Sequence, residues 1–303
     1  MAAMPEAAEK YILAVDLGTS GPKSALVSKR GEILAHTFVK NDLALHPDGG
    51  AEQDPEEWWQ SILTSLKTLL AKGLVPKDRI AAICCSTQWS GTVAVDKAGH
   101  HLMNALIWLD SRGSRYIDEI TDGWIKVEGY AVAKLQRWIR LTGGAPSHSG
   151  KDAIAHILYI KNQHPDIYQK TYKFLEPKDY INLRLTGRFA ATFDSITLHW
   201  VTDNRDINRI RYDRRLIRMS GMERHKLPDL MQAEAVLGPL KKAVADELGL
   251  SADTRVIAGT PDVQAAAIGS GAVADYAAHL YIGTSAWLTC HVPFKKTDIM
   301  SGI

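Results

Sequence analysis

The sequence predicts an α/β protein in which a mixed sheet is flanked by helices, and three observations support this fold class. Of the 303 residues, 46% are hydrophobic and 23% are charged, as in globular proteins with a buried core. Strand-length apolar runs alternate with helical patterns along the chain. The first strands follow one another through tight turns rather than through helices, which indicates that part of the sheet is antiparallel.

The first predicted element is an antiparallel meander of three strands. Residues 11–15 form an apolar strand, and the glycine-containing residues 16–21 form a turn that leads to a strand at 24–28. A second turn leads to a strand at 33–39. Gly31 in this second turn supplies the positive φ that a tight hairpin needs.

The next predicted element is a helix with clear start and stop signals. Asp54 is a good N-cap, Pro55 suits the first helical position, and Glu57 completes a capping-box pattern. Gly73 ends the helix. One face carries the apolar residues Trp59, Ile62, Leu63, Leu66, Leu69 and Leu70, a pattern typical of core packing.

The remaining elements alternate between strands and helices. Residues 92–95 and 104–109 are predicted to pair as a hairpin, and residues 143–146 form a loop between two helical segments. The other predicted strands are 80–85, 256–258, 279–282 and 286–291, and the predicted helices are 111–141, 151–163, 177–185, 213–221, 239–248 and 263–268.

Charge and cysteine content argue against several classes of protein. The 36 basic and 34 acidic residues give a net charge of +2, which provides no general attraction to nucleic acid or to an anionic membrane. The arginine-rich segment 205–226 has almost no stacking aromatic residues, so we expect a solvated face or a contact with another subunit, as in a homodimer. Cys84, Cys85 and Cys290 show no zinc-binding spacing.

The N-terminal segment gives no targeting signal. Residues 1–10 contain Glu6 and Glu9 and lack the apolar core of a secretory signal peptide. No apolar run reaches the ~18–20 residues needed to cross a bilayer. We therefore expect a cytoplasmic protein that does not bind membranes.

Two short segments that follow apolar strands are candidates for phosphate binding. Glycine lets backbone N–H groups approach an anion, and threonine and serine hydroxyls add hydrogen-bond donors. Each segment alone is also typical of an ordinary hairpin turn, and the lysine after the first segment is either an anion ligand or a solvated side chain. The candidate residues are Gly18, Thr19, Ser20, Lys23, Gly283, Thr284 and Ser285.

Two aspartates stand at strand ends, where phosphoryl transfer could use them. Asp16 is a candidate ligand of Mg²⁺ beside the phosphates, with a turn-capping role as the alternative. Asp262 precedes the helix at 263–268, whose N-terminus favours a charged carboxylate. Asp262 can accept the proton of a substrate hydroxyl, or it can cap the helix, and the two roles can coexist.

Other polar residues follow two further strands and suit a sugar or polyol. Gln88, Trp89 and Ser90 come after the strand at 80–85, and Asp110 comes after the strand at 104–109. Ligands of α/β proteins commonly lie at the carboxyl ends of strands. Ordinary turn polarity is the alternative explanation for these residues.

In order and spacing, these motifs resemble the FGGY family of carbohydrate kinases, and in particular its xylulokinase branch. The resemblance extends over residues 11–290. The segments that carry it are 16–21 with Lys23, 52–55 with Trp58 and Trp59, 88–91, 108–112, 177–180, 186–190, 259–262 and 283–285.

The resemblance implies an actin-like, ribonuclease H-like ATPase fold, with ATP and a sugar or polyol bound between two domains. It implies that Asp262 is the catalytic base and contacts the substrate, and that residues 16–19 and 283–285 form two phosphate loops for ATP with Mg²⁺. The implied reaction is ATP-dependent phosphorylation of a pentulose such as D-xylulose. The positions that match the sugar site are Gln88, Trp89, Ser90 and Asp110.

Three departures from the family pattern concern the substrate. Trp89 and Ser90 stand where xylulokinases usually have Met-His and where glycerol kinases have an Arg-Glu pair. Leu109 stands where xylulokinases usually have Asn, and Val263 follows the catalytic aspartate where Asn is common. D-xylulose is therefore the leading expectation among several sugars and polyols.

The resemblance also predicts the domain organisation. Residues 1–9 are a disordered tail, residues 10–258 form the sugar-binding domain, and residues 259–303 begin the ATP-binding domain. Family members are considerably longer, so we expect a fragment that binds ATP weakly and turns over slowly. The alternatives are a non-catalytic sugar-binding or regulatory module and an ATPase of the same fold with another task.

Overall fold

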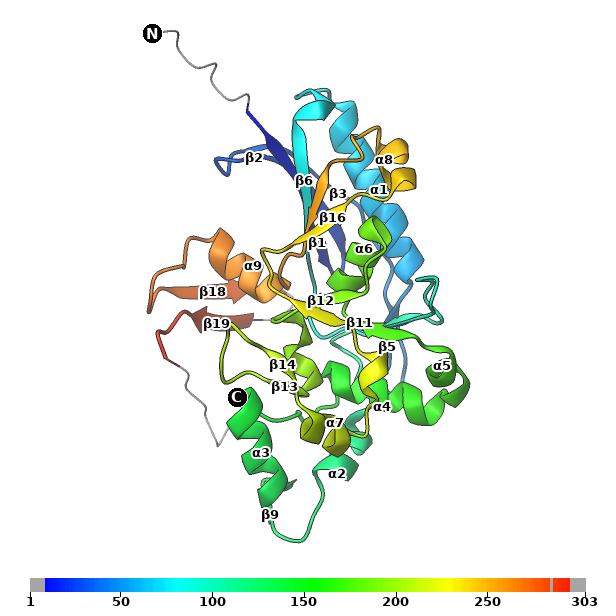
Figure 1. Ribbon diagram of the computed structural model, residues 1–303, viewed down its shortest axis with the longest axis vertical. Coiled ribbons are helices and arrows are strands. Elements are labelled where there is room, and N and C mark those ends of the chain that lie inside the picture. The colour runs from blue at the N-terminus through cyan, green and yellow to red at the C-terminus, as the bar shows by residue number, and fades with distance from the viewer. Residues whose placement is uncertain (1–8, 284–285, 295–303) are drawn as a thin grey trace.

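The computed structural model describes residues 9–283 and 286–294, and a six-stranded mixed sheet forms its centre (Figure 1). The six strands are β1 Tyr11–Gly18, β2 Gly21–Ser28, β3 Ile33–Phe38, β6 Ile80–Thr87, β16 Val236–Pro239 and β17 Arg255–Ile257. Their order across the sheet is β16-β17-β6-β1-β2-β3. β1, β6 and β17 are parallel, whereas β2 is antiparallel to both β1 and β3. The predicted mixed sheet and N-terminal meander are confirmed.

The first turn is shorter than the sequence predicted. β1 continues through Gly18, because β2 and β6 pair with it on both sides along this length. Only Thr19 and Ser20 lie in the turn. The predicted turn at 16–21 is therefore wrong at its start, and Asp16 lies inside a strand, where sheet hydrogen bonds fix its backbone.

One face of the sheet is covered by α1 (Pro55–Ala71), with α6 (Pro177–Thr186) and α8 (Lys242–Leu248) beside it (Figure 1). The apolar stripe of α1, which includes Trp59 and Leu66, is buried in the same core as the sheet residue Leu13. This burial confirms the core-packing interpretation of the stripe.

The start of α1 follows the sequence prediction in part. Asp54 is the N-cap and accepts a hydrogen bond from the N–H of Glu56 at 2.8 Å. The carboxylate of Glu57 accepts from the N–H of Asp42 at 2.8 Å. Glu57 thus ties the helix to the preceding loop, and the predicted capping box is wrong.

A second group of helices surrounds a separate apolar core, away from α8 in the view (Figure 1). The predicted helix at 111–141 is wrong in its middle, because Glu128 (φ 49°) and Gly129 (φ 83°) form a left-handed turn between β9 (Lys126–Val127) and β10 (Tyr130–Ala131). The helices of this group are α2 Ser114–Thr121, α3 Val132–Thr142, α4 Ala153–Gln163, α5 Pro165–Lys170 and α7 Arg214–Ser220, with the 3₁₀ helices η2 Ser195–His199 and η3 Arg224–Lys226 nearby and η1 Lys77–Arg79 before β6.

Short strands form small sheets around these cores. The predicted hairpin of residues 92–109 forms only in part: Thr92 and Leu106 exchange backbone hydrogen bonds, but the flanking strands join different partners. The small sheets are β4 Ala44–Leu45 with β5 Ala51–Gln53 and β8 Ala105–Leu106, β7 Val93–Val95 with β11 Lys173–Leu175, β12 Ala190–Thr192 with β15 Asp229–Met231, β13 Thr202–Asp203 with β14 Arg211–Tyr212, and β18 Ala278–Ile282 with β19 Ala286–Cys290.

Helix α9 (Asp262–Gly269) follows β17 and leads to the hairpin of β18 and β19 (Figure 1). The predicted helix at 263–268 and the two predicted strands after it are confirmed to within two residues. Among residues 9–283 and 286–294, no helix is both long and apolar enough to cross a membrane.

Candidate active site

Three parallel strands end at the same edge of the central sheet and bring the predicted aspartates together. In the sheet register, Asp16 of β1 lies beside Ser86 of β6. The turn after β17 lies against the end of β6, where Gly259 contacts the backbone of Cys85. Ligands of α/β proteins commonly bind at such an edge.

The turn after β17 places Asp262 at the start of α9. Gly259 has φ 73°, and a Cβ at this position would lie 2.0 Å from the carbonyl oxygen of Cys85, so the turn requires glycine. Pro261 occupies the N-cap position and Asp262 is the first helical residue. Asp262 is therefore not the N-cap of α9, which was its alternative role.

The surroundings of the Asp262 carboxylate disfavour its charged form. Burial raises its pKa to about 6, and the nearby charge of Asp16 adds to this effect. The N–H of Val263 opposes the rise by donating a hydrogen bond to Oδ1 at 2.9 Å. A carboxylate with a pKa near neutrality is suited to exchange a proton with a substrate.

Asp16 and Lys23 face each other across β1 and β2. The distance from Lys23 Nζ to Asp16 Oδ2 is 4.0 Å, and their side chains are 71% and 45% exposed. Burial raises the pKa of Asp16, and the ammonium group of Lys23 partly opposes this rise. Both groups stay open to solvent and can meet a charged ligand.

The acidic pair of Asp16 and Asp262 fits a magnesium ion that is bound mainly by a nucleotide. Within the part of the chain that the structure describes, no three His, Cys, Asp or Glu side chains form a complete metal cluster. Mg²⁺ usually keeps several waters and takes one or two carboxylates plus substrate phosphates, so this incomplete set suits it.

A cavity of about 1020 Å³ adjoins this edge of the sheet. Asp16, Lys23, Asp194 and Thr260 are among the residues that line it, and most of its exposed wall is apolar. The candidate phosphate-binding lysine and the candidate metal ligand therefore face one concave surface.

Thr19 and Gln88, predicted for different ligands, are joined in one internal network. The Thr19 hydroxyl donates to Gln88 Oε1 at 3.1 Å and accepts from Trp108 Nε1 at 3.0 Å. Gln88 is 2% exposed and donates to Gln53 Oε1 at 2.7 Å, while Gln53 donates to the Thr19 carbonyl oxygen at 2.8 Å. The polar groups of both predicted residues are thus engaged within the protein.

The two residues after Gln88 are held by distant backbone carbonyls. The indole N–H of Trp89 donates to the Ser195 carbonyl oxygen at 3.2 Å, and the indole is half-buried. Ser90 has φ 62° and its hydroxyl donates to the Lys151 carbonyl oxygen at 2.7 Å. A left-handed non-glycine residue is uncommon and here turns the chain sharply after β6.

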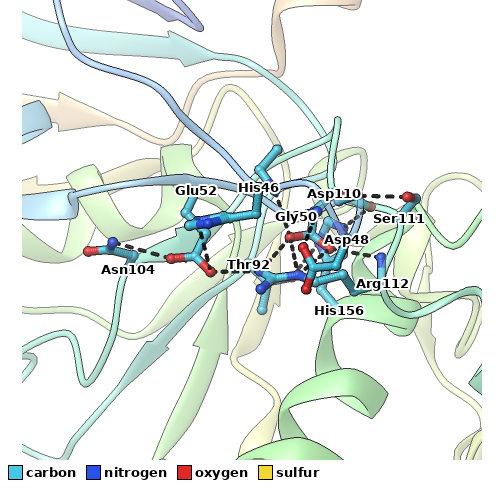
Figure 2. A network of polar contacts seen from close by, with 12 residues as sticks. His46, Asp48, Gly50, Glu52, Thr92, Asn104, Asp110, Ser111, Arg112 and His156 are labelled. Carbon is cyan, nitrogen blue, oxygen red and sulfur yellow. Dashed lines mark hydrogen bonds and ion pairs between the residues drawn. The ribbon is translucent and has the colours of Figure 1, made fainter.

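Asp110 lies inside the fold, in the network of Figure 2. Its carboxylate is 0% exposed, accepts from the N–H of Ala51 at 3.0 Å and pairs with the Arg112 guanidinium at 2.6 Å. Arg112 also pairs with Glu52 at 2.7 Å, as Figure 2 shows, and these hydrogen bonds raise its pKa. His156 Nε2 lies 3.1 Å from the Asp110 carbonyl oxygen. The predicted sugar ligand is therefore saturated by internal partners.

The remaining predicted phosphate-binding residues lie in two places. Gly18 ends β1 at the site, and Ser20, two residues later, is exposed. Gly283 is exposed after β18. Thr284 and Ser285 lie outside the described residues.

Asp194 is a cavity residue that the sequence reasoning missed. It follows β12 and accepts a hydrogen bond from the Thr260 hydroxyl, two residues before Asp262. The sequence does carry a signal, because Asp194 stands two residues after a short apolar run, and a polar residue in that place is typical of the end of a strand. The strand itself was too short to be recognised.

The sequence matches the family described as FGGY family of carbohydrate kinases, N-terminal domain, over residues 11–269. A xylulose kinase of Bacillus subtilis is 28% identical over 303 residues, which cover 95% of this chain and 55% of that protein. A gluconokinase of the same organism is 23% identical, covering 95% of this chain and 53% of that protein. The chain thus spans about half the length of the curated relatives it matches.

Solved structures show the same fold. A xylulose kinase from Rhodospirillum rubrum superposes with a TM-score of 0.82 at 20% identity, covering 95% of this chain and 56% of that one. A gluconate kinase from Lactobacillus acidophilus gives 0.80 at 24% identity, covering 93% of this chain and 54% of that one. The fold class expected from the resemblance is confirmed.

Proposed function

The chain belongs to the FGGY family of carbohydrate kinases, and from this premise we propose that the protein transfers the γ-phosphoryl group of ATP to a hydroxyl of a sugar or polyol. The observation that carries the proposal is the pair of Asp16 and Asp262 at the carboxyl edge of the sheet, where Asp16 and the exposed Lys23 line a cavity. These groups are the ones that phosphoryl transfer needs: a base, a metal-binding carboxylate and a cation.

In this proposal Asp262 acts as the general base. Its carboxylate accepts the proton of the substrate hydroxyl while that oxygen forms a bond to the γ-phosphorus and the bond from phosphorus to the ADP oxygen breaks. Burial and the charge of Asp16 raise its pKa to about 6, so it is mostly ionised at pH 7 yet more basic than an ordinary aspartate.

Asp16 and Lys23 receive the nucleotide in this proposal. Magnesium, when bound with ATP, neutralises the charge that builds up on the phosphates. Asp16 supplies a carboxylate to it, and Lys23 places a positive charge next to the phosphate oxygens. The backbone at Gly18 and the exposed Ser20 supply further donors, and the segment 283–285 is the second phosphate loop.

We propose a ketopentose, D-xylulose first, as the accepting sugar. The support is the xylulose kinase of B. subtilis at 28% identity and the ordered set of motifs that resemble that branch. Trp89 and Ser90 carry the main departure from the branch, and the half-buried indole of Trp89 offers an apolar face to a carbon chain. The sugar site belongs to residues 10–258 in this proposal.

A substrate panel tests the proposal. The intact protein is assayed with ATP and Mg²⁺ against pentuloses, hexuloses, pentitols, glycerol and gluconate, with ADP release as the readout. We expect one ketopentose to give the highest kcat/KM. Sugar binding by calorimetry without any ADP release would instead support a non-catalytic sugar-binding module, and ATP hydrolysis that no polyol stimulates would support a different ATPase.

A further inference from the structure

The Pro177-Lys178-Asp179-Tyr180 motif has no role in the proposed chemistry, yet its charges are buried. Lys178 and Asp179 are each 1% exposed, and Lys178 Nζ donates to Asp179 Oδ1 at 2.6 Å. Taking two charges out of water is costly, so such a pair needs further hydrogen bonds to be stable. Those bonds lead from α6 to the turn that carries Asp262.

One arm of the network holds the start of this turn. Lys178 Nζ donates to the Ala258 carbonyl oxygen at 3.1 Å, and Asn182 Nδ2 donates to the same oxygen at 2.7 Å. On the other side of the chain, the N–H groups of Ala258 and Gly259 each donate at 2.9 Å to carbonyls of the strand connection at 233–235. The backbone before Thr260 is therefore fixed from two directions.

A second arm holds the side chain in the middle of the turn. Asp179 Oδ2 accepts from the Ser195 hydroxyl at 2.7 Å, and Ser195 and Asp194 both bond to Thr192. The other carboxylate oxygen of Asp194 accepts from the Thr260 hydroxyl. Asp194 also accepts from the Ser195 N–H at 2.9 Å, which fixes the orientation of its carboxylate.

We propose that Asp194 is a positioning residue: through its hydrogen bond to the cavity-lining Thr260 it fixes the turn at 259–261 and so holds Asp262 near Asp16. The expected effect on kcat rests on the proposed function, because it requires Asp262 to be the general base. The structural part, a turn held by the Asp194–Thr260 bond, stands on the contacts alone.

The position of the bond explains why it matters for chemistry. Thr260 is two residues before Asp262, and Pro261 between them has a fixed φ, so a displacement of Thr260 is passed on to the base. A displacement of about 1 Å at a catalytic group can cost roughly a hundredfold in rate. Loss of this bond should therefore lower kcat and leave sugar binding largely intact.

The test compares Thr260→Val, which removes the hydroxyl and keeps the shape, with Thr260→Ser, which keeps the hydroxyl. Thr197→Val is the matched control, since Thr197 is half-buried in η2 and its hydroxyl bonds only locally, to the Phe193 carbonyl oxygen at 3.1 Å. We expect Thr260→Val to lower kcat of the intact protein at least tenfold with KM for the sugar within about twofold, and Thr260→Ser to restore most of kcat.

A second readout does not depend on activity. Hydrogen exchange of the peptide spanning residues 258–264 should become faster in Thr260→Val and in Asp194→Ala, and should stay unchanged in Thr197→Val. Unchanged exchange in the first two variants overturns the proposal. An equal loss of kcat in Thr197→Val also overturns it.

The two proposals can fail separately. If the unmodified protein phosphorylates no sugar, the proposed function fails, and the exchange experiment still decides whether Asp194 holds the turn. If the protein is an active kinase and Thr260→Val keeps a normal kcat, the positioning role fails and the kinase function stands.

Discussion

Two regions of polar residues lie at the ends of strands in this protein, and their surroundings are opposite. Gln88 and Asp110 are 2% and 0% exposed and use their side-chain atoms on internal partners. Asp16 lines a cavity, and Asp262 lies nearby at the start of α9, where burial and the charge of Asp16 raise the pKa of Asp262 to about 6. The polar side chains of the first region are engaged by internal partners, whereas the carboxylates of the second region are available to a ligand.

The difference separates stability from chemistry. A saturated polar group has no capacity left for a ligand, and removing it leaves its partners unpaired. An unsaturated carboxylate costs stability in the folded state but stays available to a proton or a cation. The comparison therefore predicts that mutations in the first region act on folding and that mutations in the second act on catalysis.

The largest expected effect is that of Asp262→Asn. The variant loses the general base, so we expect kcat for sugar phosphorylation to fall by at least about a hundredfold. The folded-state pKa lies above that of an unfolded aspartate, so the charged form destabilises the fold at pH 7 and the neutral amide should maintain or raise Tm. Asp246→Asn, on the exposed face of α8, is the control. A normal kcat in Asp262→Asn would contradict the prediction that mutations in the second region act on catalysis.

Asp110→Ala should have the next largest effect, on stability. It leaves Arg112 without its buried partner and the Ala51 N–H without an acceptor, and breaking a buried ion pair typically costs about 3–5 kcal/mol. Urea unfolding measures the loss, with the exposed Asp253→Ala as the control. A small loss of stability together with a large rise in KM for the sugar would assign Asp110 to the substrate and contradict the comparison.

Gln88→Leu should lower stability by a smaller amount. The substitution removes the partner of the Thr19 hydroxyl and of Gln53 Oε1. Thr19 is only half-buried, so the loss comes mainly from the buried Gln53 oxygen, at about 1–3 kcal/mol. Chemical denaturation at pH 7 provides the measurement, and Gln60→Leu on the exposed face of α1 is the matched control. Equal stability of the two variants would show that the network around Thr19 contributes little.

The smallest expected effect is a shift in titration. Nuclear magnetic resonance of the Asp262 carboxyl carbon, recorded without nucleotide or Mg²⁺, should give a midpoint near pH 6, because burial and Asp16 favour the neutral form. Asp16→Asn removes the repelling charge and should move the midpoint to lower pH. Asp78→Asn, 77% exposed in η1 at the opposite end of β6, should leave it unchanged. If the midpoint is the same in the unmodified protein and in Asp16→Asn, the two carboxylates do not interact.

Much of the fold could be predicted from local signals. The pattern of α1, with Asp54 as its cap, and the antiparallel order of the first strands depend on neighbouring residues, and the structure confirms them, although the turn between β1 and β2 contains only Thr19 and Ser20. The short strands β11, β12 and β15 could not be predicted, because strands of three residues have no periodicity and depend on partners distant in sequence. The hairpin of β9 and β10 was hidden by good helix-forming residues on both sides.

The sequence predicts which residues belong to the candidate site, but it does not predict how they are arranged. The motifs around Asp16 and Asp262 identify both residues, and the parallel arrangement of β1, β6 and β17 brings them to one edge of the sheet. The domain boundary at residue 258 stays a prediction, and the family match itself continues to residue 269, the end of α9. Asp194 escapes prediction because the strand before it, β12, has only three residues and its partner Thr260 is 66 residues away.

The sequence by itself determined the fold class, the family and the identity of the two carboxylates, because these depend on patterns and spacings that are local along the chain. Only the tertiary structure decided which polar residues are free to act. Gln88, Asp110 and Asp262 look alike as polar residues after strands, and their difference comes from partners that folding brings to them. The carboxylate of Asp110 is buried in an ion pair with Arg112, whereas that of Asp262 is partly buried near Asp16 and its pKa is raised to about 6.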